Sequence, residues 1–379
     1  MAHYEMRKFV APEFIFGIGA RHRAGFYAGN MGARRILVVT DPGVTAAGWL
    51  SELVDNLDEL RLPSIVFDGI TPNPKDHEIM AGAARYRDEG CDVIIALGGG
   101  SVIDCAKGIS IVSANGGHIL DYEGVDRIPI PGPPLICIPT TAGTSADISQ
   151  FAIINNTEKH YKISIISKSV VPDVALVDPE TTTTMPAYLT ACTGLDALTH
   201  GVEAFVSTAS SPVVDGHALS AIALVNTHLP RVLADASDSE ARENMMLASL
   251  QAGLAFSNAS LGAVHAMAHS LGGLLDLPHG ESNALLLEHV IRFNYPEAEE
   301  RYQRIGTMLG LRHAGEREIT ETITRLRESC GIKNGLAARG VSRGAIDDLA
   351  PPASRDACLF TNPRRASLAD LKAIYAEAL

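Results

Sequence analysis

The chain has 379 residues, of which 46% are hydrophobic and 20% are charged, and its formal net charge is −13. A chain of this length and composition is typical of a globular protein with two domains and a sizeable core. Because the chain is acidic and has no stripe of lysine or arginine, nucleic acids and anionic membrane surfaces are poor candidates for its partners.

The first half of the chain alternates short runs of β-branched residues with helical patterns. We expect strands, in chain order, at 34–41, 64–69, 91–101, 134–141 and 174–178, and a β-hairpin formed by 151–156 and 161–166. Helices are expected at 46–60, at 75–89 and from Ser101 onward. Strands that alternate with helices predict an α/β fold with a mostly parallel sheet and right-handed crossovers.

After Pro186 the pattern changes to long segments rich in alanine, leucine and glycine. Leu195, Leu198 and Val202 show the apolar spacing of a helix, and no run typical of a strand appears. We therefore predict an α/β domain over 1–185, followed by an all-helical domain over 186–379.

One part of the helical half, 244–275, has no charged residue and is long enough to raise the question of a membrane span. Gln251 and two histidines interrupt it, and much of the rest is alanine and glycine, so buried helices of a globular domain fit better. Residues 1–14 lack the pattern of a signal peptide, and the six scattered cysteines are typical of reduced thiols. We expect a cytoplasmic protein.

A glycine turn follows the most apolar predicted strand. Gly98, Gly99 and Gly100 would let backbone amides approach a ligand, because no Cβ stands in the way. Ser101 and Asp104 have the spacing of a capping box at the start of the next helix. Free amides at a helix N-terminus suit a pyrophosphate. The turn matches neither common nucleotide-binding motif, however, and a tight structural turn would explain it almost as well.

Two further loops follow predicted strands and carry polar side chains. A carboxylate at Asp41 can accept hydrogen bonds from ribose hydroxyls and would repel a 2′-phosphate, which favours NAD over NADP; an Asp-Pro turn without a ligand is the alternative. The loop PTTAGTSAD offers hydroxyl groups to a cofactor or to its own backbone, from Thr140, Thr141, Thr144 and Ser145. Because such loops gather at one edge of a parallel sheet, together they favour a nucleotide site.

Imidazoles are concentrated in an apolar part of the helical half. Asp196 and His200 lie at i and i+4, on one face of a predicted helix. His265 and His269 repeat this spacing, and His279 follows in an expected loop. Buried imidazoles need compensation, which is either a hydrogen bond or a metal. A carboxylate with three imidazoles is a suitable ligand set for a divalent ion, and hydrogen-bonded core histidines are the alternative.

Several segments together resemble the iron-containing (group III) alcohol dehydrogenases. They are GGGSVIDCAKGI, IPTTAGTSAD, PDVALVDPE, GLDALTHGVEAFVS, HAMAHSLGGLLDLPHG and the late TNPR at 361–364. The resemblance implies a dinucleotide-binding α/β domain, a helical metal-binding domain and a cleft between them. In one departure, Ser145-Ala146-Asp147 stands where the family usually has Gly-Ser-Glu, and we expect it to alter the loop near the nicotinamide.

The resemblance also implies roles for individual residues. The metal ligands would be Asp196, His200, His265 and His279, and His269 would lie near the metal without being a ligand. Because imidazole titrates near neutrality, our hypothesis is that His269 relays the released proton to water. The cofactor site would comprise Gly99, Gly100 and Ser101 at the pyrophosphate, Leu189 near the nicotinamide, and Asp41, Asn73, Thr140, Thr141, Ser149 and Lys162 elsewhere. The implied cofactors are NAD and Fe²⁺, with Zn²⁺ as the alternative ion because zinc binds most such sites more tightly. We expect a homo-oligomer, a dimer or larger.

The implied reaction transfers hydride between NAD and a small primary alcohol or diol, or its aldehyde. The metal would lower the pKa of the alcohol, and the cofactor would carry the hydride chemistry. No cluster of basic residues accompanies the ligand motifs, so neutral substrates are expected and the related dehydroquinate synthase activity is disfavoured. The alternatives are a zinc enzyme like glycerol dehydrogenase and a catalytically weak sensory protein of the same fold.

Overall fold

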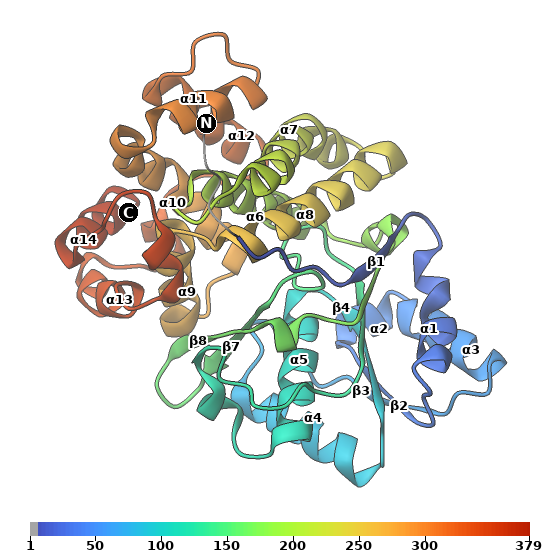
Figure 1. Cartoon of the computed structure of the whole chain (residues 1–379). Coiled ribbons are helices and arrows are strands. Elements are labelled where there is room, and N and C mark those ends of the chain that lie inside the picture. The colour runs from blue at the N-terminus through green and yellow to red at the C-terminus, as the bar shows by residue number, and fades with distance from the viewer. Residues whose placement is uncertain (1–6) are drawn as a thin grey trace.

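The computed structural model describes residues 7–379, and Figure 1 shows the strands with α1–α5 on one side of the molecule and α6–α14 on the other. The strands are β1 (Glu13–Phe16), β2 (Ile36–Val39), β3 (Ser64–Phe67), β4 (Val93–Gly98), β5 (Gly124–Val125), β6 (Leu135–Pro139), β7 (Phe151–Asn156), β8 (Tyr161–Ile166) and β9 (Val174–Val177). The helices among them are α1 (Ala24–Asn30), α2 (Pro42–Ala46), α3 (Trp49–Glu59), α4 (Asp76–Asp88) and α5 (Gly100–Asn115).

Six strands form a parallel sheet in the order β1-β9-β6-β4-β2-β3. In β2, Leu37 and Val39 belong to the core shared with α4 and α5, whereas Ile36 and Val38 belong to the core shared with α1 and α3. Both faces of the central strands are therefore buried, which explains their continuous apolar sequences. Because β2, β4 and β6 are parallel neighbours, the loops that follow them meet at one edge of the sheet, as predicted.

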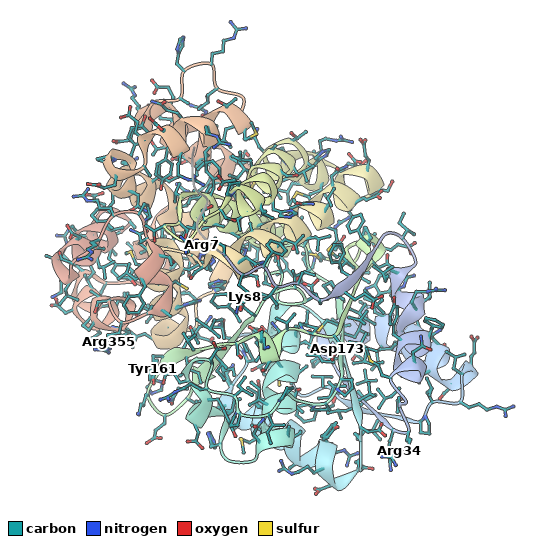
Figure 2. All side chains as sticks on the ribbon, in the orientation of Figure 1. Arg7, Lys8, Arg34, Tyr161, Asp173 and Arg355 are labelled. Carbon is teal, nitrogen blue, oxygen red and sulfur yellow. The ribbon has the colours of Figure 1, made fainter. Side chains whose placement is uncertain are left out.

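A second, three-stranded sheet joins this half to the helices. Its order is β5-β8-β7, and β7 and β8 form the predicted antiparallel hairpin. The start of β8 packs closely against α9 (Ala263–Leu275): a Cβ on Gly273 would lie 2.6 Å from the Cα of Tyr161. Figure 2 shows Tyr161 at this junction, close to Arg355 from the helical half.

The helical half contains α6 (Ala187–Val206), α7 (Pro212–Ala234), α8 (Ser239–Ala259), α9, α10 (His279–Asn294), α11 (Glu299–Met308), α12 (Glu316–Ser329), α13 (Ile346–Ala353) and α14 (Leu368–Glu377). Between β9 and Leu379 the structure has no further strand, so the predicted class, an α/β part followed by an all-helical part, is confirmed. Among the helices of residues 7–379, none combines the length and the apolar character needed to cross a membrane.

Some local predictions were wrong. The helix expected at 46–60 is α3, which begins only at Trp49 because Gly48 before it takes a left-handed conformation with φ of 91°. The short helix α2, Pro42–Ala46, was not predicted. The strands β1 and β5 were not predicted. The loop expected around His279 is instead the first turn of α10, which begins at that residue.

The capping box expected at Ser101 and Asp104 is also absent. Gly99 is the N-cap residue, in an extended conformation, and α5 begins at Gly100, so Ser101 lies inside the first turn. The carboxylate of Asp104 instead accepts a hydrogen bond from the backbone N–H of Ile153, at 3.2 Å. A glycine at the N-cap leaves the amides of this turn without the side-chain cap that a serine would have supplied.

Candidate metal centre and nucleotide cleft

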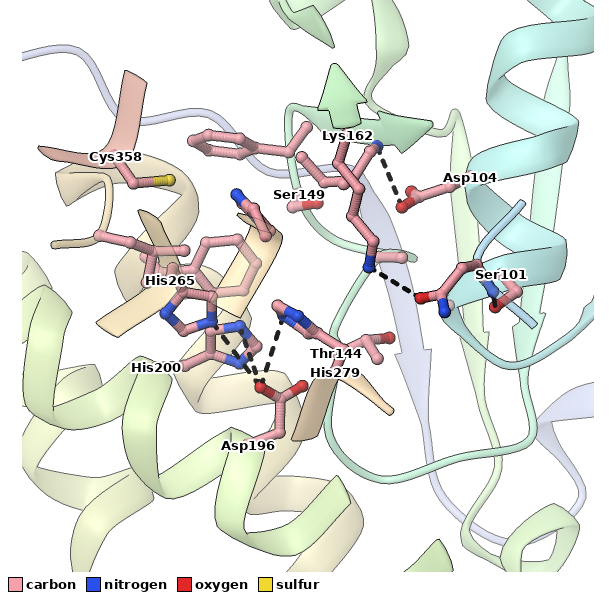
Figure 3. Close-up of a pocket in the computed structure, with 18 of the residues that line it drawn as sticks. Ser101, Asp104, Thr144, Ser149, Lys162, Asp196, His200, His265, His279 and Cys358 are labelled. Atoms are coloured by element: carbon pink, nitrogen blue, oxygen red, sulfur yellow. Dashed lines mark hydrogen bonds and ion pairs between the residues drawn. The ribbon is translucent and has the colours of Figure 1, made fainter. Parts of the chain in front are cut away.

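Three imidazoles surround one carboxylate oxygen in the helical half. Asp196 and His200 lie on α6, His265 on α9 and His279 at the start of α10. The Oδ1 atom of Asp196 is 3.9 Å from Nε2 of His200, 3.7 Å from Nε2 of His265 and 3.9 Å from Nε2 of His279. Figure 3 shows the three rings directed at this carboxylate. The donor atoms of Asp196, His265 and His279 all lie within 4.8 Å of one another, and His200 joins them through the same oxygen of Asp196.

The other ring nitrogens point away from this centre, which fixes how two of the rings are held. Nδ1 of His200 lies 3.2 Å from the carbonyl oxygen of Gly143, and Nδ1 of His265 lies 2.6 Å from a carboxylate oxygen of Glu203. Both partners are acceptors, so each Nδ1 carries the proton when the ring is neutral, and Nε2 keeps its lone pair. This is the tautomer that a metal ligand requires.

The charges of the cluster also suit a cation. Burial lowers the pKa of His200 to about 4 and that of His279 well below its usual value, so both rings are neutral at pH 7. Burial raises the pKa of Asp196, but the three imidazoles outweigh burial and hold it below the usual range. Burial likewise lowers the pKa of His265, yet hydrogen bonds to Asp196 and Glu203 raise it to about 9. The two buried carboxylates favour a positive charge here, which a proton or a metal ion can supply.

Asn283 shows that the donor atoms converge on one point. Its Nδ2 donates to Oδ1 of Asp196 at 2.6 Å and lies 3.0 Å from Nε2 of His265 and 3.2 Å from Nε2 of His279. A single amide nitrogen thus lies within hydrogen-bond distance of one carboxylate oxygen and two ring nitrogens. A mixed nitrogen and oxygen set of this kind fits a divalent transition metal.

The glycine turn lies against the threonine-rich loop after β6. A Cβ on Gly99 would lie 3.0 Å from Cγ2 of Thr141, and a Cβ on Gly100 would lie 2.7 Å from Oγ1 of Thr144. Larger residues would therefore force the two loops apart. Within residues 7–379 no side chain caps the start of α5, so its first amides are available to an anion.

A chain of polar contacts connects the turn to the helical half. The backbone N–H of Asn73 donates to Oγ of Ser101 at 3.2 Å, and the Oδ1 atom of Asn73 accepts from Nζ of Lys162 at 2.7 Å. The Nδ2 atom of Asn73 donates to Asp276, just after α9, at 2.6 Å. Asn73 itself has a φ of 56°, a conformation that asparagine tolerates better than most residues.

One cavity joins these two regions. Ten of the fifteen residues to which the resemblance gives a role line it, namely Asn73, Gly100, Ser101, Ser149, Lys162, Asp196, His200, His265, His269 and His279. The other five do not line this cavity: Asp41, Gly99, Thr140, Thr141 and Leu189. Of these, Asp41, Gly99 and Thr140 lie at the carboxyl ends of the adjacent strands β2, β4 and β6, whereas Leu189 is in the first turn of α6.

His269 is held beside the cluster by a residue from the C-terminal segment. Its Nδ1 lies 2.8 Å from Oδ2 of Asp356, and its ring stacks on that of His279, with centroids 5.4 Å apart. Cys358 lies next to this pair and also lines the cavity. Burial raises the pKa of the Cys358 thiol well above its usual value, so the thiol stays protonated.

Several residues at this site are not marked by any motif or regular spacing in the sequence. Asn283 lies one helical turn after His279 in α10, and this spacing is the one feature of the local sequence that predicts a contact between them. Asp356 reaches His269 from a distant part of the chain. Apolar residues from both halves complete the wall of the cavity, namely Phe151, Ile153, Phe256 and Leu261.

The departure from the usual Gly-Ser-Glu is accommodated by packing. Ser145 takes a φ of 50°, and its hydroxyl donates to the carbonyl oxygen of Ser249 in α8 at 2.6 Å. A Cβ on Gly253 would lie 2.5 Å from the Cβ of Ser145, so the glycine makes room for the serine. Burial raises the pKa of Asp147 to about 6.

Two family models match the chain, one over each half. The model for iron-containing alcohol dehydrogenase matches residues 11–179, and the model for the C-terminal part of the Fe-containing alcohol dehydrogenase family matches residues 190–379. Together they cover both the glycine turn and the cluster of imidazoles.

Named relatives align over almost the full length. Alcohol dehydrogenase 4 of Schizosaccharomyces pombe is 42% identical over 374 residues, which cover 98% of this chain and 89% of that protein. The 1,3-propanediol dehydrogenase of Klebsiella pneumoniae is 40% identical, with 99% of both chains covered. The NAD-dependent methanol dehydrogenase of Bacillus methanolicus is 38% identical, with 98% of this chain and 99% of that protein covered. A crystal structure of 1,3-propanediol oxidoreductase superposes with a TM-score of 0.95 at 38% identity, over 99% of this chain and 100% of that one.

Proposed function

The chain belongs to the iron-containing alcohol dehydrogenase family and is an oxidoreductase of alcohols or diols, and we propose that it works with NAD and one divalent ion, iron(II) or zinc. The ligands would be Asp196, His200, His265 and His279. The observation that carries the proposal is the convergence of three Nε2 atoms on one carboxylate oxygen, in a cavity that reaches the glycine turn. The relative from Bacillus methanolicus is an NAD-dependent enzyme, which supports the choice of cofactor.

When bound, the ion would polarise the alcohol oxygen as a Lewis acid, and NAD would take up the hydride. The chain's own part is to hold the reactants and move the proton. Asp356 occupies Nδ1 of His269, so Nε2 is the nitrogen of that ring left to exchange a proton in the cavity. The apolar side chains of Phe151, Phe256 and Leu261 line the same cavity and would exclude water around the carbon chain of the substrate.

The cofactor would lie across the edge of the large sheet. Its pyrophosphate would meet the amides at Gly99, Gly100 and Ser101, and the remaining contacts would come from Asp41, Asn73, Thr140, Thr141, Ser149, Lys162 and Leu189. Residues 1–185 would form the nucleotide domain and residues 186–379 the metal domain. A homo-oligomer and a cytoplasmic location also stay predictions.

Removal and return of the metal test this proposal. Protein stripped with a chelator under anaerobic conditions should form no NADH from NAD with 1-propanol or 1,3-propanediol at alkaline pH. Addition of iron(II) or zinc should restore NADH formation, because the ion is needed to polarise the substrate. The matched variant His200→Ala, which lacks one ligand, should bind less metal and should not recover. Stripped protein as active as loaded protein would contradict the proposal.

His269→Ala provides a second arm of the same experiment. It should retain its metal but lose about 100-fold in kcat, because a proton acceptor is removed while the ligands remain. An unchanged kcat across the pH range would remove the proton-relay role and leave the metal site intact.

A further inference from the structure

Glu203 is a buried carboxylate that meets one of the proposed ligands from behind. It lies on α6, one turn after His200, and only 3% of its surface is exposed. Its Oε2 atom is 2.6 Å from Nδ1 of His265, and its Oε1 atom accepts a hydrogen bond from the backbone N–H of Val264 at 2.7 Å. Among residues 7–379, no lysine or arginine forms an ion pair with it. A buried carboxylate without such a partner is costly, so its contacts must compensate.

The start of α9 is shaped to receive this carboxylate. Gly262 is the N-cap residue and has no side chain to satisfy the first amides of the helix. Glu203 accepts a hydrogen bond from the backbone N–H of Val264, and Asn362 accepts one from the backbone N–H of Ala263 at 3.1 Å. A Cβ on Gly262 would lie 2.8 Å from both of these side-chain oxygens. A negative charge is also favourable at a helix N-terminus.

We propose that Glu203 is a positioning residue for the metal centre. Its carboxylate holds the proton of His265 on Nδ1, so that Nε2 presents a lone pair to the ion. The same carboxylate fixes the first turn of α9, which carries the ring. The inference rests on the proposed metal site. Because both oxygens of Glu203 are already hydrogen-bonded, this residue would not bind the ion itself but would orient His265, which does.

A carboxylate can do this where an amide cannot. Both oxygens of Glu203 accept: Oε1 from the backbone N–H of Val264, and Oε2 from the ring of His265 and, at 3.4 Å, from its backbone N–H. Glutamine has one acceptor oxygen and cannot accept on both sides. If that oxygen faced His265, the NH₂ group would meet the backbone N–H of Val264 and disturb the first turn of α9; if it faced Val264, that turn would be kept. The NH₂ group would then face Nδ1 of His265, which would have to accept. The ring proton would move to Nε2 and block the position of the ion.

The test compares Glu203→Gln with Glu288→Gln. Glu288 is also buried and lies in α10, but it pairs with Arg327 and not with a proposed ligand. Zinc affinity is measured by titration of chelator-stripped protein, and the unfolding midpoint of the stripped protein reports the structural cost of each change. Glu203→Gln should bind zinc about 10- to 100-fold more weakly than wild type, whereas Glu288→Gln should bind it normally.

A second measurement needs no variant. In zinc-loaded wild-type protein labelled with ¹⁵N-histidine, long-range ¹H–¹⁵N spectra should show His265 with its proton on Nδ1. A proton on Nε2, or normal zinc affinity in Glu203→Gln, would overturn the inference. Failure of the proposed function itself is distinguishable, because wild-type protein would then bind no zinc in the titration.

Discussion

Asp41 combines a structural contact with a free carboxylate oxygen. Its Oδ1 atom accepts a hydrogen bond from the backbone N–H of Val44 at 2.9 Å and so caps α2. No contact within the described residues uses Oδ2. Asp41 follows β2, which pairs with β4, the strand that leads into the glycine turn. Asp41 can therefore cap α2 and bind a ribose hydroxyl at the same time.

We predict that Asp41→Ser relaxes the choice between the two nicotinamide cofactors. Serine is as good an N-cap as aspartate, so α2 should be retained, while the negative charge that repels a 2′-phosphate is lost. The ratio of kcat/KM for NADP to that for NAD should rise about tenfold, equivalent to about 1.4 kcal/mol. Steady-state kinetics with both cofactors measures the ratio, and a ratio equal to that of wild type would remove Asp41 from the cofactor site.

Among single residues, the site residues that could be predicted from the sequence are those that recur at helical spacing. Asp196 with His200 has the i, i+4 relation within one helix, and the structure places both at the cluster. Glu203 and Asp356 were not given roles, because each contacts its histidine across a large separation in sequence. Such pairs depend on how helices pack, which local spacing does not report.

Close approach between α6 and α10 sets the distance between two of the proposed ligands. Gly280, the second residue of α10, lies against the backbone carbonyl of Cys192 in α6, and a Cβ there would collide with that oxygen. The adjacent His279 and the nearby Asp196 are both proposed ligands, so the contact sets the distance between their helices.

Gly280→Ala should therefore destabilise the fold and weaken metal binding. Pushing α10 away from α6 should cost about 1–3 kcal/mol in the free energy of unfolding. The matched control is Gly216→Ala in α7, where a Cβ meets no atom within 4 Å. That change should stabilise the protein by about 0.5–1 kcal/mol, because alanine favours a helix. Urea unfolding measures both values, and equal effects would contradict the packing argument.

Elements with strong periodicity were predicted well, and short or irregular ones were not. The central strands and the hairpin follow from runs of apolar residues bounded by turns. The four-residue strand β1 pairs only with β9, at the edge of the sheet, and carries too little pattern to identify. The cap of α5 was misplaced because glycine, rather than serine, takes the extended conformation.

At the scale of the whole molecule, hydrogen bonds between side chains from three parts of the chain cross the cleft. Lys162 comes from β8, Asn73 from the loop before α4, and Asp276 from the end of α9. Burial lowers the pKa of Lys162 to about 8, although Asp276, Asp104 and Asp196 oppose the shift. The charge of this lysine therefore changes near pH 8.

This pKa predicts a pH dependence of nucleotide binding. Below about pH 8 the Lys162 ammonium is charged and attracts the anionic cofactor, and above it the attraction is lost. Affinity for NADH should fall about tenfold as the pH rises through this range, and Lys162→Met should bind weakly with little pH dependence. Fluorescence titration at pH 6.5 and 9.5 measures the difference. The same pH dependence in both proteins would assign it to another group.

The proposed ligands come from three different helices, α6, α9 and α10, so the site can form only after these helices have been synthesised and packed. A nascent chain that has emerged only as far as α9 lacks His279, and one whose C-terminal segment has not docked lacks the Asn362 contact at the start of α9. Where a site does not exist in the unfolded state, the binding energy of the ion becomes part of the folding energy. We therefore expect the proposed site to bind an ion only after α6, α9 and α10 have packed together.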